Sequence, residues 1–336
     1  MRAAVISEHG GSDLITVHDD WADPVAGDGQ VVVRVRACAL NYHDLFTLHG
    51  MPGITIPFPL IMGIDIAGEI AEVGAGVADW KVGDRVLIDP WDAVENKLVG
   101  EMMDGGLAEL VAVHSRTLIR LPDDVSFADA AALPVAFGTA YRMMVTRGEV
   151  GPGDKVLVLG ASGGVGTGCV QLASLAGAHV IAAASTDAKL EQLAALGADE
   201  GINYKDADFM KVVHERHGKP RVSGTGGLDV VVNFTGGDTW GPSLRSLRKG
   251  GRLLNCGATA GFAVETDLRY VWSYELDIRG SDGWLRSDLE ALIELVRVGK
   301  LRPPVDRVLP LSEVRTAFDL LEQRQVLGKI VVAPDR

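Results

Sequence analysis

Residues 156–166 read VLVLGASGGVG, an apolar strand that runs directly into a glycine-rich turn. A helical stretch follows, and its apolar positions are Val170, Leu172, Ala173 and Ala176. Residues 180–184 (VIAAA) then have the continuous apolar character of a second buried parallel strand. Strand, glycine turn, helix and strand in this order predict a mononucleotide-binding unit.

The glycine turn makes a physical demand that explains its composition. Gly163 and Gly166 allow the backbone to turn tightly and to approach a pyrophosphate closely. The next helix would direct its free N–H groups and its positive dipole end at that anion. A glycine-rich match alone is weak evidence, but the flanking strands and helix favour a dinucleotide site over an ordinary strand–helix turn.

The end of the second strand predicts which dinucleotide binds. A site that prefers NAD usually carries Asp or Glu there, which binds the ribose 2′-hydroxyl. Here the strand runs into Ala184, Ser185 and Thr186, and Asp187 comes only after the strand end. Lys189 follows within one turn and could neutralise a 2′-phosphate. A lone lysine would be a solvated helix residue, but together with the missing acid it favours NADPH.

Composition limits the classes of protein and partner. The chain has 336 residues, enough for two domains with their own cores. It has no run of about 18 apolar residues, and its first residues, MRAAVISEHG, lack the layout of a signal peptide. Cys38, Cys169 and Cys256 are odd in number and far apart, which predicts a reducing cytoplasm and no disulfide framework. The formal net charge of −13 argues against nucleic acid or a membrane as partner.

The pattern along the chain changes near Ser126. The clearest strand candidates before it are 31–36, 68–73 and 85–89. From Ser126, a plausible helix N-cap, strands and helices alternate to about residue 283. The remaining elements are a helix near 288–299, a helix near 311–324 and a last strand at 329–333. We expect an α/β chain with a β-rich domain at 1–125, a doubly wound parallel-sheet domain at 126–285 and a return to the first domain at 286–336.

Six short segments, spread over nearly the whole chain, carry a family likeness. They are ACALNYHDL (37–45), GIDIAGEIAEVGAGV (63–77), GDRV (83–86), AALPVAFGTAYRMM (131–144), the glycine turn and VLGKIVV (326–332). With this order and spacing the chain resembles the medium-chain dehydrogenase/reductases, and most of all their zinc-free NADPH:quinone oxidoreductase branch. The resemblance implies a GroES-like catalytic domain, a Rossmann domain for NADPH, and a homodimer joined through the Rossmann sheets.

Single positions decide whether a catalytic metal is expected. Zinc-dependent members of the superfamily hold it with a cysteine, a histidine and a second cysteine, where this sequence has Asn41, Ile64 and Val135. These side chains offer no thiolate, imidazole or carboxylate, so we expect no metal there. The structural zinc lobe is also missing, since residues 89–106 contain no cysteine.

Histidines elsewhere do not suggest another metal site. His214 and His217 stand at i, i+3 in HERHG, but their basic and polar neighbours favour a solvated helix face. We therefore expect no functional metal.

The resemblance also implies contacts to the cofactor, position by position. Those with the pyrophosphate are Ser162, Gly163, Gly164, Val165 and Gly166. Those with the 2′-phosphate are Ser185, Lys189, Tyr204 and Arg324, although Tyr204 could be a loop aromatic and Arg324 a helix cap. Those near the nicotinamide and its ribose are Thr139, Asn233, Cys256 and Gly257.

Asn41, Tyr42 and His43 are the catalytic candidates. Asn41 replaces a metal ligand and would donate a hydrogen bond to the substrate oxygen. His43 occupies the position of the hydroxyl residue that relays protons in the zinc enzymes, and it could supply the proton after hydride transfer. A turn histidine bonded to the backbone is the alternative. We expect Asp44 and Asp65 to support this loop rather than to act as acids.

Loss of zinc changes the expected chemistry. Without a Lewis acid, reduction of an unactivated ketone becomes harder. Hydride addition to an enone or a quinone is easier, because the charge delocalises to an oxygen that needs only hydrogen-bond donors and a proton source. We therefore expect an NADPH-dependent oxidoreductase whose small-molecule substrates are quinones or α,β-unsaturated carbonyls.

Two alternatives remain open. An enoyl-CoA reductase of the acryloyl-CoA type would need a basic rim around the cleft to bind the CoA phosphates. The expected rim, residues 46–60 and 91–104, contains one lysine, Lys97, and no arginine. A non-catalytic NADPH-binding protein, as some lens crystallins of this branch are, is the other.

Overall fold

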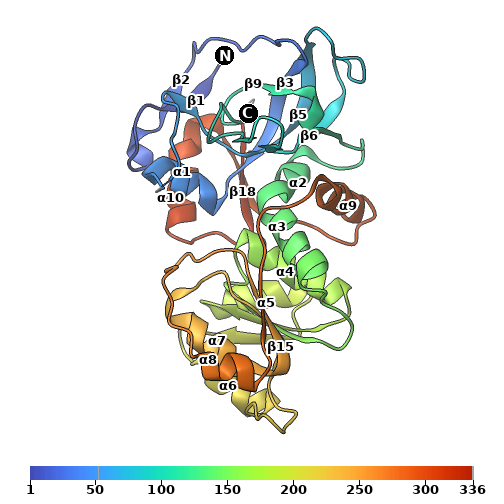
Figure 1. Cartoon of the computed structure of the whole chain (residues 1–336). Coiled ribbons are helices and arrows are strands. Elements are labelled where there is room, and N and C mark those ends of the chain that lie inside the picture. Colours follow the sequence, from blue (N-terminus) through green and yellow to red (C-terminus); the bar gives the residue numbers. More distant parts are fainter. Residues whose placement is uncertain (52, 335–336) are drawn as a thin grey trace. The chain divides into compact units, whose positions relative to one another are not determined.

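The chain forms two compact units in the computed structural model, which describes residues 1–51 and 53–334 (Figure 1). The first unit combines Met1–Ala136 with Leu289–Arg336, and the second is Phe137–Asp288. Residues 335 and 336, the end of the third segment expected from the sequence, lie outside the described residues. Helix α2 (Phe127–Ala131) packs on three strands of the first unit, so the first unit extends beyond the expected boundary at 125.

The first unit is built on a seven-stranded, mostly antiparallel sheet. Its path runs β10 (Leu118–Arg120), β6 (Arg85–Ile88), β5 (Asp65–Val73), β3 (Gln30–Ala39), β18 (Lys329–Ala333) and β17 (Val305–Pro310), and β9 (Leu110–His114) also pairs with β3. Val31, Val33 and Val35 alternate into the core from β3, as the sequence predicts. The last strand therefore lies next to one of the first, within a single sheet.

Smaller elements complete the first unit. The three-stranded sheet has the order β2 (Thr16–His18), β1 (Ala3–Ile6) and β4 (Leu60–Ile61), and the hairpin joins β7 (Trp91–Asp92) to β8 (Lys97–Leu98). Besides α2, the helices are α1 (Tyr42–His49), α9 (Arg286–Arg297), which the unit boundary crosses, and α10 (Val314–Glu322). Ser126 caps α2 as predicted, since its hydroxyl accepts the Asp129 N–H at 3.0 Å.

The second unit is a six-stranded parallel sheet with helices packed on it (Figure 1). The strand order is β13 (Glu200–Asn203), β12 (His179–Ala184), β11 (Lys155–Leu159), β14 (Leu228–Val232), β15 (Leu247–Asn255) and β16 (Asp277–Gly280). The helices are α3 (Thr139–Tyr141), α4 (Gly164–Leu175), α5 (Asp187–Ala195), α6 (Phe209–His217), α7 (Trp240–Ser246) and α8 (Leu268–Ser273). In chain order this is 3-2-1-4-5-6, the order of a Rossmann domain, and it confirms the predicted fold class.

Candidate functional site

Three strand ends meet at one edge of the large sheet in the first unit. Ala39 ends β3, and it pairs with Asp65 at the start of β5 and with Val331 near the start of β18. Because both neighbours run antiparallel to β3, their first residues lie beside its last ones. Asn41, two residues after β3, therefore comes close to Asp65 and Lys329.

Asn41, Asp65 and Lys329 form a buried polar cluster. The Lys329 ammonium donates to Asn41 Oδ1 and to Asp65 Oδ2, the latter at 3.2 Å. Asn41 Nδ2 donates to Asp65 Oδ2 at 2.9 Å, and the Val135 N–H donates to Asp65 Oδ1 at 3.0 Å. The side chains of Lys329 and Asp65 are 2% and 0% exposed. This cluster thus contains its own cation, bonded to Asn41, the residue that stands at one of the three expected ligand positions.

These residues do not fit a catalytic zinc ion. Burial raises the pKa of Asp65, and the Lys329 ammonium together with three hydrogen bonds opposes that rise. Ile64 is fully buried and alkyl, and Val135 contributes only its backbone N–H. A zinc ion would have to displace a lysine that already neutralises the carboxylate, and it would gain one amide oxygen as a further ligand.

His43 forms a second pair with a buried carboxylate that sequence analysis missed. Its Nε2 lies 2.5 Å from Glu101 Oε2, and Thr47 Oγ1 donates to the same oxygen at 3.4 Å. Burial lowers the pKa of His43, but the hydrogen bond and charge of Glu101, helped by Asp44 and Asp65, raise it further, so the net shift is upward. Within the described part of the chain, the His43 ring is therefore bonded to a side chain and not to the backbone.

Asp44 and Tyr42, the neighbours of His43 on α1, contact other residues of the same loop and helix. Asp44 Oδ2 accepts the Asn41 N–H at 2.7 Å, while Asp44 Oδ1 is buried without a hydrogen bond. Burial is the largest cause that raises the pKa of Asp44 to about 6. Tyr42 is partly buried, and its ring stands edge-on to Phe46 at 5.5 Å between centroids.

The glycine turn of the second unit is shaped by two glycines. Gly160 has a φ of +66°, a conformation that L side chains rarely adopt. A Cβ on Gly166 would lie 2.4 Å from the Gly160 carbonyl oxygen, so only glycine fits there. Gly163, by contrast, is extended at φ −79°, and it precedes the first residue of α4, where backbone N–H groups have no helical acceptor. This cradle fits a dinucleotide pyrophosphate.

Two of the four expected 2′-phosphate residues directly follow β12 and β13, a third begins the next helix, and the fourth lies in the other unit. Ser185 directly follows β12, and the Tyr204 N–H donates to Ala184 O at 3.1 Å, which brings these two segments together. Lys189 lies in the first turn of α5, and its N–H donates to the capping hydroxyl of Thr186. Arg324 belongs to the first unit, where it adopts a φ of +57° after α10.

Asn233 shapes the turn after β14. Its Nδ2 donates to Thr239 and Ser243, and its Oδ1 accepts the N–H groups of Thr235 and Gly236. Both ends of this fully buried amide are therefore occupied by the protein.

The other expected nicotinamide-side residues follow strands or begin a helix. Cys256 follows β15, and burial raises the pKa of its thiol to about 12. The Gly257 carbonyl accepts a hydrogen bond from Asn255 Nδ2 at 2.7 Å. Thr139 is buried at the start of α3.

The prediction of a solvated histidine face on α6 is wrong for His217. Its side chain is only 8% exposed and faces Glu200, whereas His214 Nε2 lies 2.9 Å from the Arg245 carbonyl oxygen. The reason is packing, because the last residues of α6 contact the first residues of β13: His217 faces Glu200, and Arg216 donates to the Gly201 carbonyl.

Comparison with known proteins places the chain in a family. Residues 27–123 match the alcohol dehydrogenase GroES-like domain, and residues 164–297 match the zinc-binding dehydrogenase domain. The NADPH-dependent alkenal/one oxidoreductase of Arabidopsis thaliana, a chloroplastic protein, is 32% identical over 99% of the chain and 80% of the relative. A quinone oxidoreductase of Lama guanicoe is 30% identical over 99% of the chain and 97% of the relative. The chain belongs to the medium-chain dehydrogenase/reductase superfamily, in its quinone-oxidoreductase-like branch.

Other members of the superfamily are equally similar. A crotonyl-CoA reductase of Streptomyces avermitilis is 32% identical over 94% of the chain and 82% of the relative. The crystal structure of an NAD-dependent alcohol dehydrogenase superposes with a TM-score of 0.91 at 36% identity, covering 99% of both chains. Membership in this branch confirms the expected fold and an oxidoreductase activity. Among the described residues no helix is both long and apolar enough to cross a membrane.

Proposed function

We propose that this quinone-oxidoreductase-like protein reduces quinones or α,β-unsaturated carbonyl compounds with NADPH and without a catalytic metal. The Asn41–Asp65–Lys329 cluster supports the proposal most, because a lysine balances the buried Asp65 charge and binds Asn41, which stands at a zinc-ligand position of the zinc enzymes. Fixed hydrogen-bond donors suit an enolate or a quinol anion, whose charge is already delocalised. The names of the alkenal/one and quinone relatives describe the same chemistry.

The second unit offers the residues that would hold NADPH. The pyrophosphate would lie over residues 162–166, and Ser185, Lys189 and Tyr204 would face the 2′-phosphate. No carboxylate occupies the residue that ends β12, and Asp187 accepts a hydrogen bond from Asn203. When bound, NADPH supplies a hydride to the substrate carbon.

Asn41 would orient the substrate oxygen. Lys329 fixes its Oδ1, and Asp65 takes one N–H of Nδ2 at 2.9 Å. The other N–H reaches only the Ala39 carbonyl at 3.5 Å, the outer limit of a hydrogen bond. We assign this second N–H to the substrate oxygen, where it would stabilise developing negative charge.

His43 would then protonate the reduced substrate. Glu101 accepts the Nε2 proton and stabilises the charged ring, so the Nδ1 proton is the one to deliver. Among the described residues, none hydrogen-bonds to His43 Nδ1. After hydride addition to the β-carbon of an enone, this proton would go to the α-carbon and leave neutral imidazole. Tyr42, packed on Phe46, would limit the site sterically.

The test is NADPH oxidation by the purified protein with a quinone, an enone, an enoyl-CoA and a saturated ketone. We expect turnover with the first two and little with the ketone. A preference for the enoyl-CoA would instead support the second candidate, which the crotonyl-CoA reductase relative favours, although Lys97 is paired with Glu95 at 3.1 Å. No turnover with any of them would favour a non-catalytic NADPH-binding protein.

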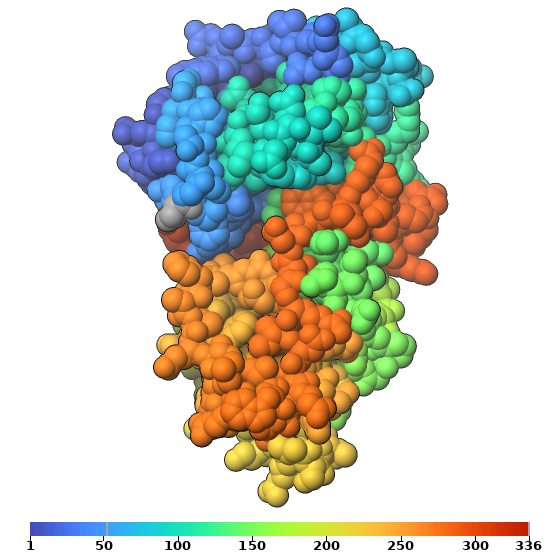
Figure 2. Space-filling view, viewed as in Figure 1, coloured from blue at the N-terminus to red at the C-terminus, as the bar shows by residue number. Residues whose placement is uncertain are grey.

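We also propose a homodimer that works in a reducing cytoplasm. Strand β16 is an edge of the parallel sheet, and Ile278 on it and Trp272 on α8 are 39% and 65% exposed. Residues 260–285, orange in Figure 2, cover much of the visible face of the second unit. A strand at the edge of the described sheet, with exposed apolar side chains on it and beside it, suits pairing with a second copy. The three free cysteines suit a reducing compartment.

A further inference from the structure

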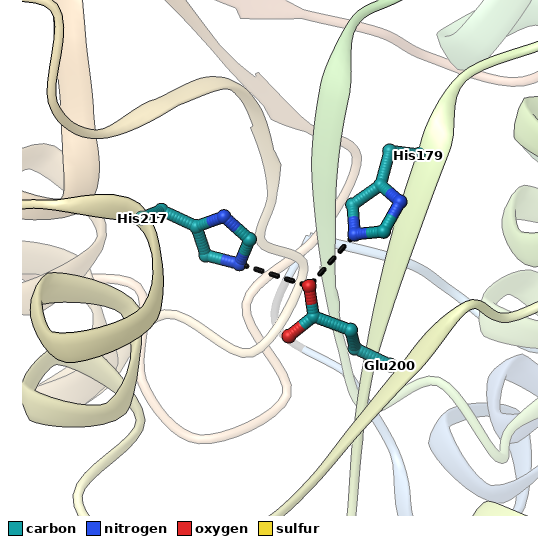
Figure 3. A group of neighbouring side chains, drawn as sticks. All are labelled: His179, Glu200 and His217. Carbon is teal, nitrogen blue, oxygen red and sulfur yellow. Dashed lines mark hydrogen bonds and ion pairs between the residues drawn. The ribbon is translucent and has the colours of Figure 1, made fainter.

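We propose that His179, Glu200 and His217 form a metal site in the second unit, one that takes a transition-metal ion such as Zn²⁺. The three side chains converge from three segments (Figure 3). His179 begins β12, Glu200 begins β13 and His217 ends α6. They therefore lie at the amino ends of the strands, whereas the glycine turn follows the carboxyl end of β11. The site is separate from the nucleotide cradle.

The donor atoms have the spacing that a small metal ion requires. Glu200 Oε1 lies 2.7 Å from His179 Nε2 and 3.2 Å from His217 Nε2, and all three atoms lie within 4.8 Å of one another. Donors about 2.0–2.2 Å from a tetrahedral zinc ion stand roughly 3.4 Å apart. Small rotations of these side chains would open the cluster enough to receive the ion, with water as a fourth ligand.

His217 supplies an independent sign of a missing ligand. Its side chain is 8% exposed, and its buried Nε2 points at Glu200 without forming a hydrogen bond of acceptable geometry. A buried imidazole nitrogen that contacts a carboxylate without forming a hydrogen bond costs free energy. Coordination of a metal ion by this nitrogen would remove that cost.

The surroundings orient the ligands and leave a moderate charge. Asp199 Oδ2 lies 3.6 Å from His179 Nδ1, in the carboxylate–histidine arrangement that supports many metal-bound imidazoles. Arg216 Nη1 holds the other oxygen of Glu200 at 3.2 Å, which leaves Oε1 for the ion. Lys155 adds positive charge near His217, and the carboxyl end of α6 adds negative charge. A histidine-rich donor set in such a field favours zinc over magnesium or calcium.

A metal bound here would be a structural metal that cross-links parts of the fold. It would tie the end of α6 to the starts of β12 and β13, three segments separated in sequence. Because the ligands lie away from the glycine turn, we expect removal of the metal to affect stability and leave turnover unchanged.

The experiment uses the full-length protein stripped with a chelator and titrated with ZnSO₄. We expect saturable binding of about one Zn²⁺ per chain and a higher melting temperature, with MgSO₄ as the ion control. At a free Zn²⁺ concentration 100 times the Kd, the folded-to-unfolded ratio should rise about 100-fold. His179→Ala and His217→Ala should lose both effects, and His214→Ala, on the same helix, should keep them.

Glu200→Gln and His217→Gln are the variants to use if an alanine variant fails to fold. They keep the side-chain volume and remove a good zinc ligand. Zn²⁺ binding that persists in these variants, or is absent from the wild type, overturns the proposal. Loss of turnover on chelation, restored by Zn²⁺, would also overturn it, because a catalytic metal would then be present.

Discussion

Each unit gathers three polar side chains where three chain segments meet, but the two groups carry opposite kinds of chemistry. The cluster of the first unit has an amide, a carboxylate and an ammonium, and the ammonium balances the charge of the carboxylate. The cluster of the second unit has two imidazoles and a carboxylate, and one imidazole nitrogen has no hydrogen bond.

If the proposed site in the second unit binds zinc, the position of the metal in this protein follows from donor chemistry and not from superfamily membership. The first cluster includes one position, Asn41, where the zinc enzymes have a ligand, but it offers no histidine or cysteine, whereas the second offers two histidines and a carboxylate. Whether a group of side chains binds a metal ion depends on its donor atoms and on the local charge.

Lys329→Met should have the largest effect, because it leaves the Asp65 carboxylate buried and unpaired. We expect a loss of about 3–5 kcal/mol in the free energy of unfolding, measured with urea. The double variant Lys329→Met/Asp65→Asn should recover much of this loss, since the unpaired charge is gone. A double variant as unstable as the single one would show that the ammonium does not balance Asp65.

Asp44→Asn should change how stability depends on pH. Burial raises the pKa of Asp44 from 3.8 to about 6, so the folded protein binds this proton more tightly than the unfolded chain. Protonated Asp44 therefore adds to the free energy of unfolding. This stabilisation is fully present below about pH 4 and is lost as the pH rises through about 6; it amounts to about 3 kcal/mol at 1.36 kcal/mol per pKa unit. Urea unfolding at several pH values should show this fall flattened in Asp44→Asn and intact in the exposed control Asp123→Asn.

His43→Ala should lower turnover of an enone roughly 100-fold at saturating NADPH, if His43 delivers the proton. The loss should be smaller with a quinone, whose reduced anion can be protonated by water. His49→Ala, on the same helix but exposed, is the control.

Glu101→Gln sharpens the same test. His43 with a raised pKa stays protonated to higher pH, and turnover falls as the pH rises through that value. Removal of the Glu101 charge should move this limb of the pH profile to lower pH. If the pH profile of Glu101→Gln does not shift, we would conclude that water donates the proton. Unchanged turnover of both substrates in His43→Ala would lead to the same conclusion.

Lys189→Ala should weaken NADPH binding by about 1.5–3 kcal/mol and leave NADH binding nearly unchanged, because only NADPH carries the 2′-phosphate. Titration of both cofactors measures the difference, with Lys211→Ala as the matched exposed lysine. Equal losses for both cofactors would contradict a phosphate contact.

Chelation should have the smallest effect on activity, namely none. Incubation with EDTA should leave turnover intact, while elemental analysis follows the metal content before and after. The comparison of the two clusters predicts that any zinc found depends on His179 and His217 and not on Asn41 or Asp65. Zinc that remains bound in the His217→Gln variant would instead favour a binding site in the first unit.

Local patterns were sufficient to predict most of the architecture. Alternating apolar residues in 31–36 predicted β3, and the strand–glycine–helix order predicted the nucleotide-binding sheet. Strand β17 was missed, because Pro303 and Pro304 precede it and charged residues interrupt its apolar positions. The choice of Asn41 and His43 as candidates came from the resemblance, and their roles remain predictions.

The partners of those candidates could not be predicted in the same way. Lys329 opens an apolar strand, a sign of a buried lysine, but its partner Asn41 lies 288 positions earlier. Glu101 carries no local signal, since its burial depends on contact with a helix 58 positions away. His217 was misjudged because its neighbours in sequence are polar, whereas its neighbours in space belong to two strands.

The position of β18 has a consequence for how the chain is made. This strand lies between β3 and β17 in the large sheet, and it brings the lysine that neutralises Asp65. During synthesis, residues 137–288 emerge as a continuous stretch and can complete their sheet on their own. The first unit, begun earlier, cannot complete its large sheet or pair Asp65 with Lys329 until residue 329 has been translated. The half of the molecule that starts first is therefore the last to be finished.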